Sequence, residues 1–131
     1  MNSFINEFVE VKVIAGEQTL SVTFLGFIPH KNLIDVVEHE YALISHYQIK
    51  KCFIDLRLIP VYDKGSKEYI KDIWFSRVIA LGVRYVAFIV PEGILGQISM
   101  KNAHNINANT AITVEHFKEP EDAIKWLKTC E

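Results

Sequence analysis

The chain of 131 residues lacks the features that mark membrane and nucleic-acid-binding proteins. Its longest uninterrupted apolar run lies between Tyr85 and Val90, whereas a helix that spans a bilayer needs about 20 apolar residues. Neither charge sign dominates, because 14 basic residues stand against 16 acidic ones and the net charge is −2. Such a balance lacks the strong basic field that gathers nucleic acid or anionic lipid. The sequence therefore predicts neither membrane insertion nor nucleic-acid binding.

Cysteine is scarce as well. Cys52 and Cys130 are the only two in the chain, and Cys52 stands in an apolar run, where cysteine is usually a small buried hydrophobe. The first twelve residues contain Glu7 and Glu10 and no basic stretch ahead of an apolar segment, which is unlike a secretory signal. We therefore expect a cytoplasmic protein with two reduced thiols.

Motifs that carry common chemistry are missing too. The six glycines are scattered, so neither a dinucleotide-binding fingerprint nor a phosphate-binding Walker loop is present. No serine has the small neighbours of a nucleophile elbow. Asp35, His39 and His46 share the polar side of a helical pattern, but the last two are separated by about 10 Å of helix, too far for one metal ion. The sequence predicts no catalytic centre, no metal site and no cofactor.

The composition, 50% hydrophobic and 23% charged, is that of one globular domain. Apolar residues alternate with polar or charged ones over 8–14 and again over 20–27, which predicts a β-hairpin with one solvated face. Helical spacing and apolar runs then alternate along the rest of the chain. We expect helices over 31–47, 66–81, 94–100 and from about 119 to 127, strands over 51–56, 84–90 and 111–117, and a polar loop over 102–110.

This order predicts a single α/β domain over residues 1–131. An N-terminal β-hairpin is followed by βα units, and strands that are separated by helices favour parallel pairing. The expected architecture is a small mixed, mostly parallel sheet flanked by helices.

The predicted helix 66–81 is apolar nearly all round, which is typical of a helix covered on both sides. Its core-facing line is taken as Ile70, Trp74, Val78 and Leu81. Phe75 and Ile79 then project almost to the opposite side. Their cover is either the segment Ile94–Met100, a second subunit, or a bound apolar ligand or partner protein. Arg77 falls on the inward side, where it either pairs with Asp55 or Asp63 or binds an anion.

Several motifs stand in one order along the chain. They are Trp74-Phe75-x-Arg77, Ala80-Leu81-Gly82, the strand Val86 to Pro91, and the ending Val114 to Leu127 with its acidic turn and Ala-x-x-Trp-Leu helix. Together they resemble the SpoIIAA-like proteins, a branch of the STAS class (sulfate transporter and anti-sigma-factor antagonist), over about residues 8–128. The resemblance implies a regulatory or ligand-binding module without a catalytic centre.

Anti-sigma antagonists of this class carry an Asp-Ser-Ser-Gly motif whose second serine is phosphorylated. The matching stretch here is Asp63-Lys64-Gly65-Ser66, which keeps the acid but has lysine and glycine at the two serine places. We therefore expect Ser66 to be the N-cap of the following helix rather than a phosphorylated switch.

Two functions follow as expectations. The first is a non-enzymatic regulatory or protein-binding domain that forms a homodimer through the second helix, with Phe75 and Ile79 at the interface. The second is a module for a small apolar ligand, or for a lipid as the family's comparison with Sec14-type domains implies. In that case Arg77 binds the acidic head group of the ligand, and the apolar part of the ligand lies between the second helix and the segment with Ile94 and Ile98.

Overall fold

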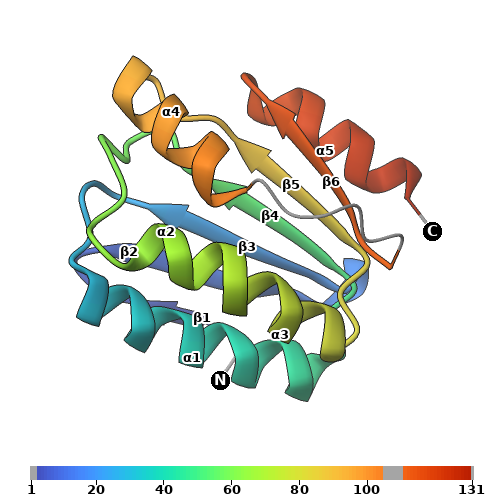
Figure 1. The fold of residues 1–131 in the computed structure, drawn as a ribbon. Coiled ribbons are helices and arrows are strands. Elements are labelled where there is room, and N and C mark those ends of the chain that lie inside the picture. Colours follow the sequence, from blue (N-terminus) through green and yellow to red (C-terminus); the bar gives the residue numbers. More distant parts are fainter. Residues whose placement is uncertain (1–2, 105–110, 131) are drawn as a thin grey trace.

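The computed structural model describes residues 3–104 and 111–130. One sheet contains β1 (Ser3–Ile5), β2 (Val9–Ile14), β3 (Thr19–Phe24), β4 (Lys51–Asp55), β5 (Tyr85–Ile89) and β6 (Thr113–Phe117), side by side in chain order (Figure 1). The pairs β1–β2 and β2–β3 are antiparallel, and the three pairs from β3 to β6 are parallel. This confirms the expected α/β domain with a mixed sheet.

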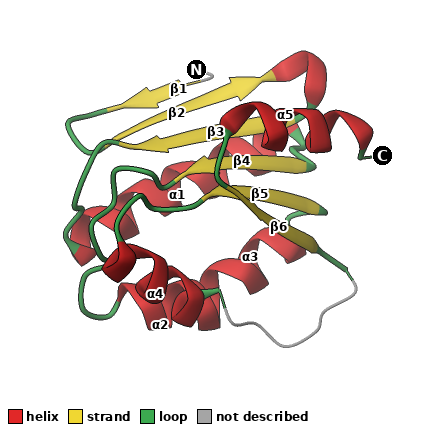
Figure 2. Cartoon of the chain, turned by 90° about the horizontal axis from the view of Figure 1, so that it is seen from above, coloured by secondary structure: helices red, strands yellow, loops and turns green. Residues whose placement is uncertain are grey.

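The helices lie unequally on the two faces of the sheet. They are α1 (His30–Tyr47), the second helix made of α2 (Ser66–Tyr69), η2 (Ile70–Trp74) and α3 (Phe75–Ala80), then α4 (Ile94–Ala103) and α5 (Pro120–Thr129); η1 (Ala15–Glu17) joins β2 to β3. Figure 2 shows α1, the second helix and α4 on one face and α5 on the other. None of the helices in the described part of the chain is long and apolar enough to cross a bilayer.

The main core lies between the sheet and the three helices that share a face. In β2, Val9 and Val11 are fully buried, while Lys12 between two inward positions is exposed. The alternation therefore turns one face of the hairpin to solvent, as predicted. A smaller core lies under α5, where Ala123 and Leu127 pack against β5. Cys52 is buried in the main core, and both cysteines are free thiols, as expected.

Two elements differ from the expected ones. Strand β1 was not expected, because three residues are too few to show an alternation; it pairs with β2 through registers such as Phe4 with Val11. Helix α4 continues to Ala103, so the predicted polar loop begins later than residue 102. Most of that predicted loop, residues 105–110, lies outside the described residues.

The second helix corrects the predicted orientation of Phe75. Its middle is a π-helix, in which the Phe75 N–H bonds to the Ile70 carbonyl, five residues back. A π-turn holds more residues than an α-turn, so the residues after it are rotated relative to a continuous α-helix. Phe75 consequently turns into the core, where it is 2% exposed and packs edge-on against Trp74. The expected outward projection of Phe75 is wrong.

The same rotation carries Arg77 outward. Its side chain is exposed, and its guanidinium lies over the Tyr41 ring, 4.3 Å from the ring centre. The expected pairing of Arg77 with Asp55 or Asp63 is wrong. Asp55 instead accepts hydrogen bonds from the Arg57 guanidinium, the shortest at 2.7 Å, and Asp63 accepts the backbone N–H of His30.

Candidate functional site

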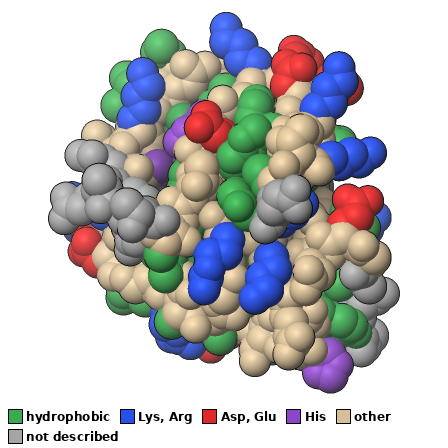
Figure 3. Space-filling model, turned by 90° about the vertical axis from the view of Figure 1, so that its right-hand side faces the viewer, with side chains coloured by type: hydrophobic (Ala, Val, Ile, Leu, Met, Phe, Trp, Pro, Cys, Tyr) green, Lys and Arg blue, Asp and Glu red, His purple; other side chains and the backbone are tan. Residues whose placement is uncertain are grey.

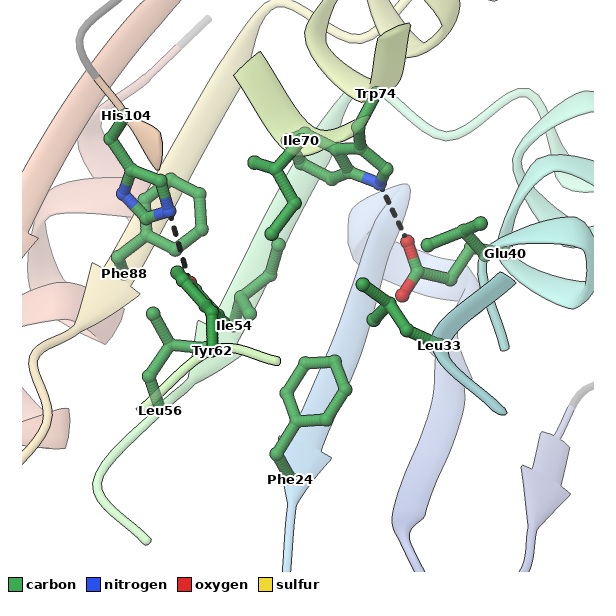
Figure 4. Close-up of a pocket in the computed structure, with 11 residues that line it drawn as sticks. Phe24, Leu33, Glu40, Ile54, Leu56, Tyr62, Ile70, Trp74, Phe88 and His104 are labelled. Atoms are coloured by element: carbon green, nitrogen blue, oxygen red, sulfur yellow. Dashed lines mark hydrogen bonds between the residues drawn. The ribbon is translucent and has the colours of Figure 1, made fainter. Parts of the chain in front are cut away.

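A cavity of about 30 Å³ lies between the sheet, α1 and the second helix. Figure 4 shows its walls, which come from β3, β4 and β5, from α1 and the second helix, from the loop after β4 and from the residue that follows α4. The walls are apolar except for three side chains, Glu40, Tyr62 and His104. A space of this size holds one or two molecules the size of water.

Glu40 supplies a carboxyl group to this cavity. It lies on the apolar side of α1 and is 2% exposed. One carboxyl oxygen, Oε1, accepts a hydrogen bond of 2.9 Å from the indole Nε1 of Trp74 (Figure 4). Burial raises the pKa of Glu40 to about 7, although the bond from Trp74 acts in the opposite direction. Near neutral pH both the protonated and the charged carboxyl are therefore populated.

On the wall of the cavity opposite Glu40, hydrogen bonds connect three side chains in a row, Tyr62, His104 and His116. The Tyr62 hydroxyl lies 3.2 Å from Nε2 of His104, and Nδ1 of His104 lies 3.0 Å from Nε2 of His116 on β6. Burial, with a smaller contribution from His116, lowers the pKa of His104 to about 3. His104 is thus neutral at physiological pH. One of its ring nitrogens can accept a hydrogen bond from the Tyr62 hydroxyl, while the other donates a hydrogen bond to His116.

A second candidate site is the exposed apolar side of α4. Ile94, Leu95 and Ile98 are 70%, 68% and 51% exposed, while Ser99 on the other side of the helix is buried. The loop after β4 lies against this helix, because the Ser99 hydroxyl accepts the Tyr62 backbone N–H at 3.1 Å. That loop carries two more exposed apolar side chains, Leu58 and Val61. We call the exposed side chains of the helix, Ile94, Leu95 and Ile98, the α4 surface.

The predicted switch region, Asp63, Lys64 and Ser66, is tied to the start of α1. The Asp63 carboxylate accepts the backbone N–H of His30 at 2.7 Å and that of Lys64 at 2.8 Å. These two bonds, that from His30 first, lower the pKa of Asp63. The Ser66 hydroxyl lies 2.9 Å from Nδ1 of His30.

The expected N-cap role of Ser66 is wrong. The N-cap of α2 is Gly65, whose φ of 88° is the left-handed conformation that glycine adopts easily. Ser66 is consequently the first helical residue, and its side chain turns inward, where it is 1% exposed. Its hydroxyl is used by His30 rather than by a free amide of the first turn.

The expected ligand or partner surface does not form as one patch. Ile94 and Ile98 are exposed on α4, but Phe75 is in the core and Ile79 is partly buried against it. Helix α4 does lie against α2 and η2. The cavity, however, is lined by Ile70 and Trp74 of the second helix and by none of the residues expected to hold an apolar ligand.

Sequence reasoning missed Glu40, Tyr62 and His104. The signal for Glu40 was a carboxylate next to the apolar line of the first helix, where burial of an acid is costly. Tyr62 and His104 carried no comparable signal, because each sits at an irregular connection and their contact depends on the tertiary fold.

No family of known proteins matches the chain, and no curated protein or solved structure is significantly similar to it. Among the described residues, no three His, Cys, Asp or Glu side chains converge in a way that could hold a metal ion.

Proposed function

We propose that the chain is a non-enzymatic, regulatory protein-binding domain, and that the α4 surface is where it binds a second copy of itself. The observation that carries the proposal is the gathering of Ile94, Leu95 and Ile98 on two turns of one helix, each at least half exposed. Contiguous exposed apolar side chains of this kind are typical of protein interfaces.

A second copy suits this surface because its side chains are apolar. Segment 94–100 contains no charged residue, and the one charged residue of α4 is Lys101, so the helix offers little charge pattern that selects a different partner. Two such helices can meet about a two-fold axis, where each apolar patch covers its equivalent. The dimer interface that we proposed from the sequence on the second helix is therefore proposed on α4 instead, because Phe75 is buried in the core.

The regulatory part of the proposal rests on the loop after β4. This loop packs against α4 through the bond between Tyr62 and Ser99, and its next residue, Asp63, accepts the backbone N–H of His30 at the start of α1. A partner on the α4 surface therefore binds to a helix that is linked to α1 through this loop. The free thiols of Cys52 and Cys130 support a place in the reducing cytoplasm.

Sedimentation equilibrium and native mass spectrometry test the dimer. We expect wild-type protein to dimerise at micromolar concentration and Ile98→Glu to be a folded monomer. The matched control is Ile73→Glu, at a residue 42% exposed on the second helix, which should dimerise like wild type. A wild-type monomer, or equal loss in the two variants, contradicts self-association through α4.

A small-molecule binder is the second candidate, and it rests on the buried Glu40 carboxyl, which faces a cavity with otherwise mostly apolar walls. The polar group of the ligand would bond to the Glu40 carboxyl, and any ligand larger than water requires the walls to move apart. The same native mass spectra distinguish the two functions, because a co-purified ligand lost in Glu40→Leu favours the binder.

A further inference from the structure

The end of the sheet opposite the α4 surface carries a cluster of cations. Four of them, Lys50, Lys51, Arg84 and Lys128, line one hollow of about 600 Å³, where the described part of the chain contributes a single acidic side chain, Glu17. We call these five residues and Tyr85 the basic hollow. Figure 3 looks onto this end of the molecule and shows blue Lys and Arg side chains next to a green hydrophobic strip.

Backbone hydrogen bonds bring these distant residues together. The Gln18 carbonyl in the β2–β3 turn accepts the Lys50 N–H at 2.9 Å, and the Lys50 carbonyl accepts the Arg84 N–H at 2.8 Å. Lys128 comes from the end of α5, which packs against β4 and β5. Rigid secondary structure therefore fixes the backbones that carry the four cations.

Helix C-terminal ends account for three of the four cations, since Lys128 lies in the last turn of α5 and two others bond to carbonyls at such ends. The Lys51 ammonium donates to the Leu127 carbonyl of α5 at 2.6 Å, and the Arg84 guanidinium donates to the Val83 carbonyl, just after α3, at 3.1 Å. Cations are favoured at such C-terminal ends. Neither ion pair found among the described residues involves the hollow, since these join Lys12 to Glu10 and Arg57 to Asp55.

The hollow continues into an apolar depression. This smaller space, about 220 Å³, shares Glu17, Lys51 and Lys128 with the hollow and is otherwise lined in part by Ile14, Phe53, Ile124 and Leu127. The site therefore offers positive charge at one end and apolar contacts at the other. Four cations against one acid suit a group with two negative charges better than a single carboxylate.

We propose that the basic hollow binds a phosphorylated small molecule, with the phosphate among the four cations and an apolar or aromatic part in the adjoining depression. The site lies at the opposite end of the parallel strands from the α4 surface and is independent of dimerisation. Its charge is local, because the chain as a whole has a net charge of −2.

Isothermal titration calorimetry with phenyl phosphate and with inorganic phosphate tests the proposal. We expect saturable binding of both probes at low salt, with phenyl phosphate the tighter. Lys50→Gln and Lys128→Gln, whose side chains have no hydrogen bond to other described residues, should each weaken both probes at least about fivefold, which is the effect of two unit charges about 4 Å apart in water. Lys101→Gln, an exposed lysine on α4, is the matched control and should bind like wild type.

The apolar part has its own test. Ile124 is 43% exposed beside the hollow, and Ile124→Ser should weaken phenyl phosphate while leaving inorganic phosphate unchanged. The proposal is overturned if neither probe binds, if Lys101→Gln weakens binding as much as Lys50→Gln, or if the two probes bind equally.

Discussion

Replacing Glu40 by glutamine should change how the stability of the protein depends on pH. Glutamine has nearly the same shape and keeps an oxygen that can accept the Trp74 N–H, but it cannot ionise. The cavity offers the Glu40 carboxylate one hydrogen bond from Trp74 and otherwise mostly apolar walls. Ionisation of this group in the folded protein is therefore costly.

The magnitude follows from the pKa of Glu40. It is raised from 4.5 to about 7 in the folded protein, so the folded state holds this proton more tightly than the unfolded state does. Stability then falls as the pH rises from 4.5 to 7, because the unfolded chain releases the proton first. The full difference corresponds to roughly 3 kcal/mol of unfolding free energy above pH 7.

His104 acts with the opposite sign. Its pKa is lowered from 6.5 to about 3, so the unfolded state binds the proton more tightly and stability falls as the pH drops below 6.5. Between pH 4.5 and 6.5 the effects of Glu40 and His104 nearly cancel. The pKa of His116 is also lowered by burial, so the remaining slope of wild-type stability in this range has the sign of the histidine effect.

The measurement is urea unfolding, followed by circular dichroism, at pH 4.5, 6, 7 and 8. Subtracting the wild-type values from those of Glu40→Gln removes the contributions of His104 and His116. We expect the difference to change by roughly 3 kcal/mol in favour of the variant between pH 4.5 and 8. The control is Glu38→Gln, an exposed glutamate on the same helix, for which the difference should stay constant. A constant difference for Glu40→Gln as well would refute the argument.

Two further substitutions test the packing around the loop after β4. Gly96→Ala places a methyl group 2.7 Å from Cβ of Pro91 and 2.8 Å from the Ile59 carbonyl. The clash should lower the free energy of unfolding by about 1–3 kcal/mol, measured by chemical denaturation. The control is Gly93→Ala, which has open space around it and should not clash. Ser66→Ala should cost about 1 kcal/mol through the lost bond to His30. Ser66→Asp should lower the melting temperature further because it buries a carboxylate at a position 1% exposed; an aspartate variant as stable as wild type would show that this side chain is free to leave the interior.

The sequence by itself determined most of the elements and the class of fold. Helix α1 and strands β4 and β5 fall within one or two residues of the predicted ranges, because each has a clear apolar period or run bounded by polar or turn residues. The alternation of strands and helices then implied parallel pairing. These features depend on neighbours within a few residues of each other, which is the range over which a sequence pattern is informative.

Only the tertiary structure decided which side chains meet. The π-turn at Ile70–Trp74 rotates Phe75 into the core and Arg77 out of it, and no regular helical period contains that rotation. The basic hollow joins cations from three distant segments, Lys50 and Lys51, Arg84, and Lys128, of a chain without net positive charge. Such groupings depend on strand order and on how α5 docks, and these are set by the packing of the whole core rather than by local propensity.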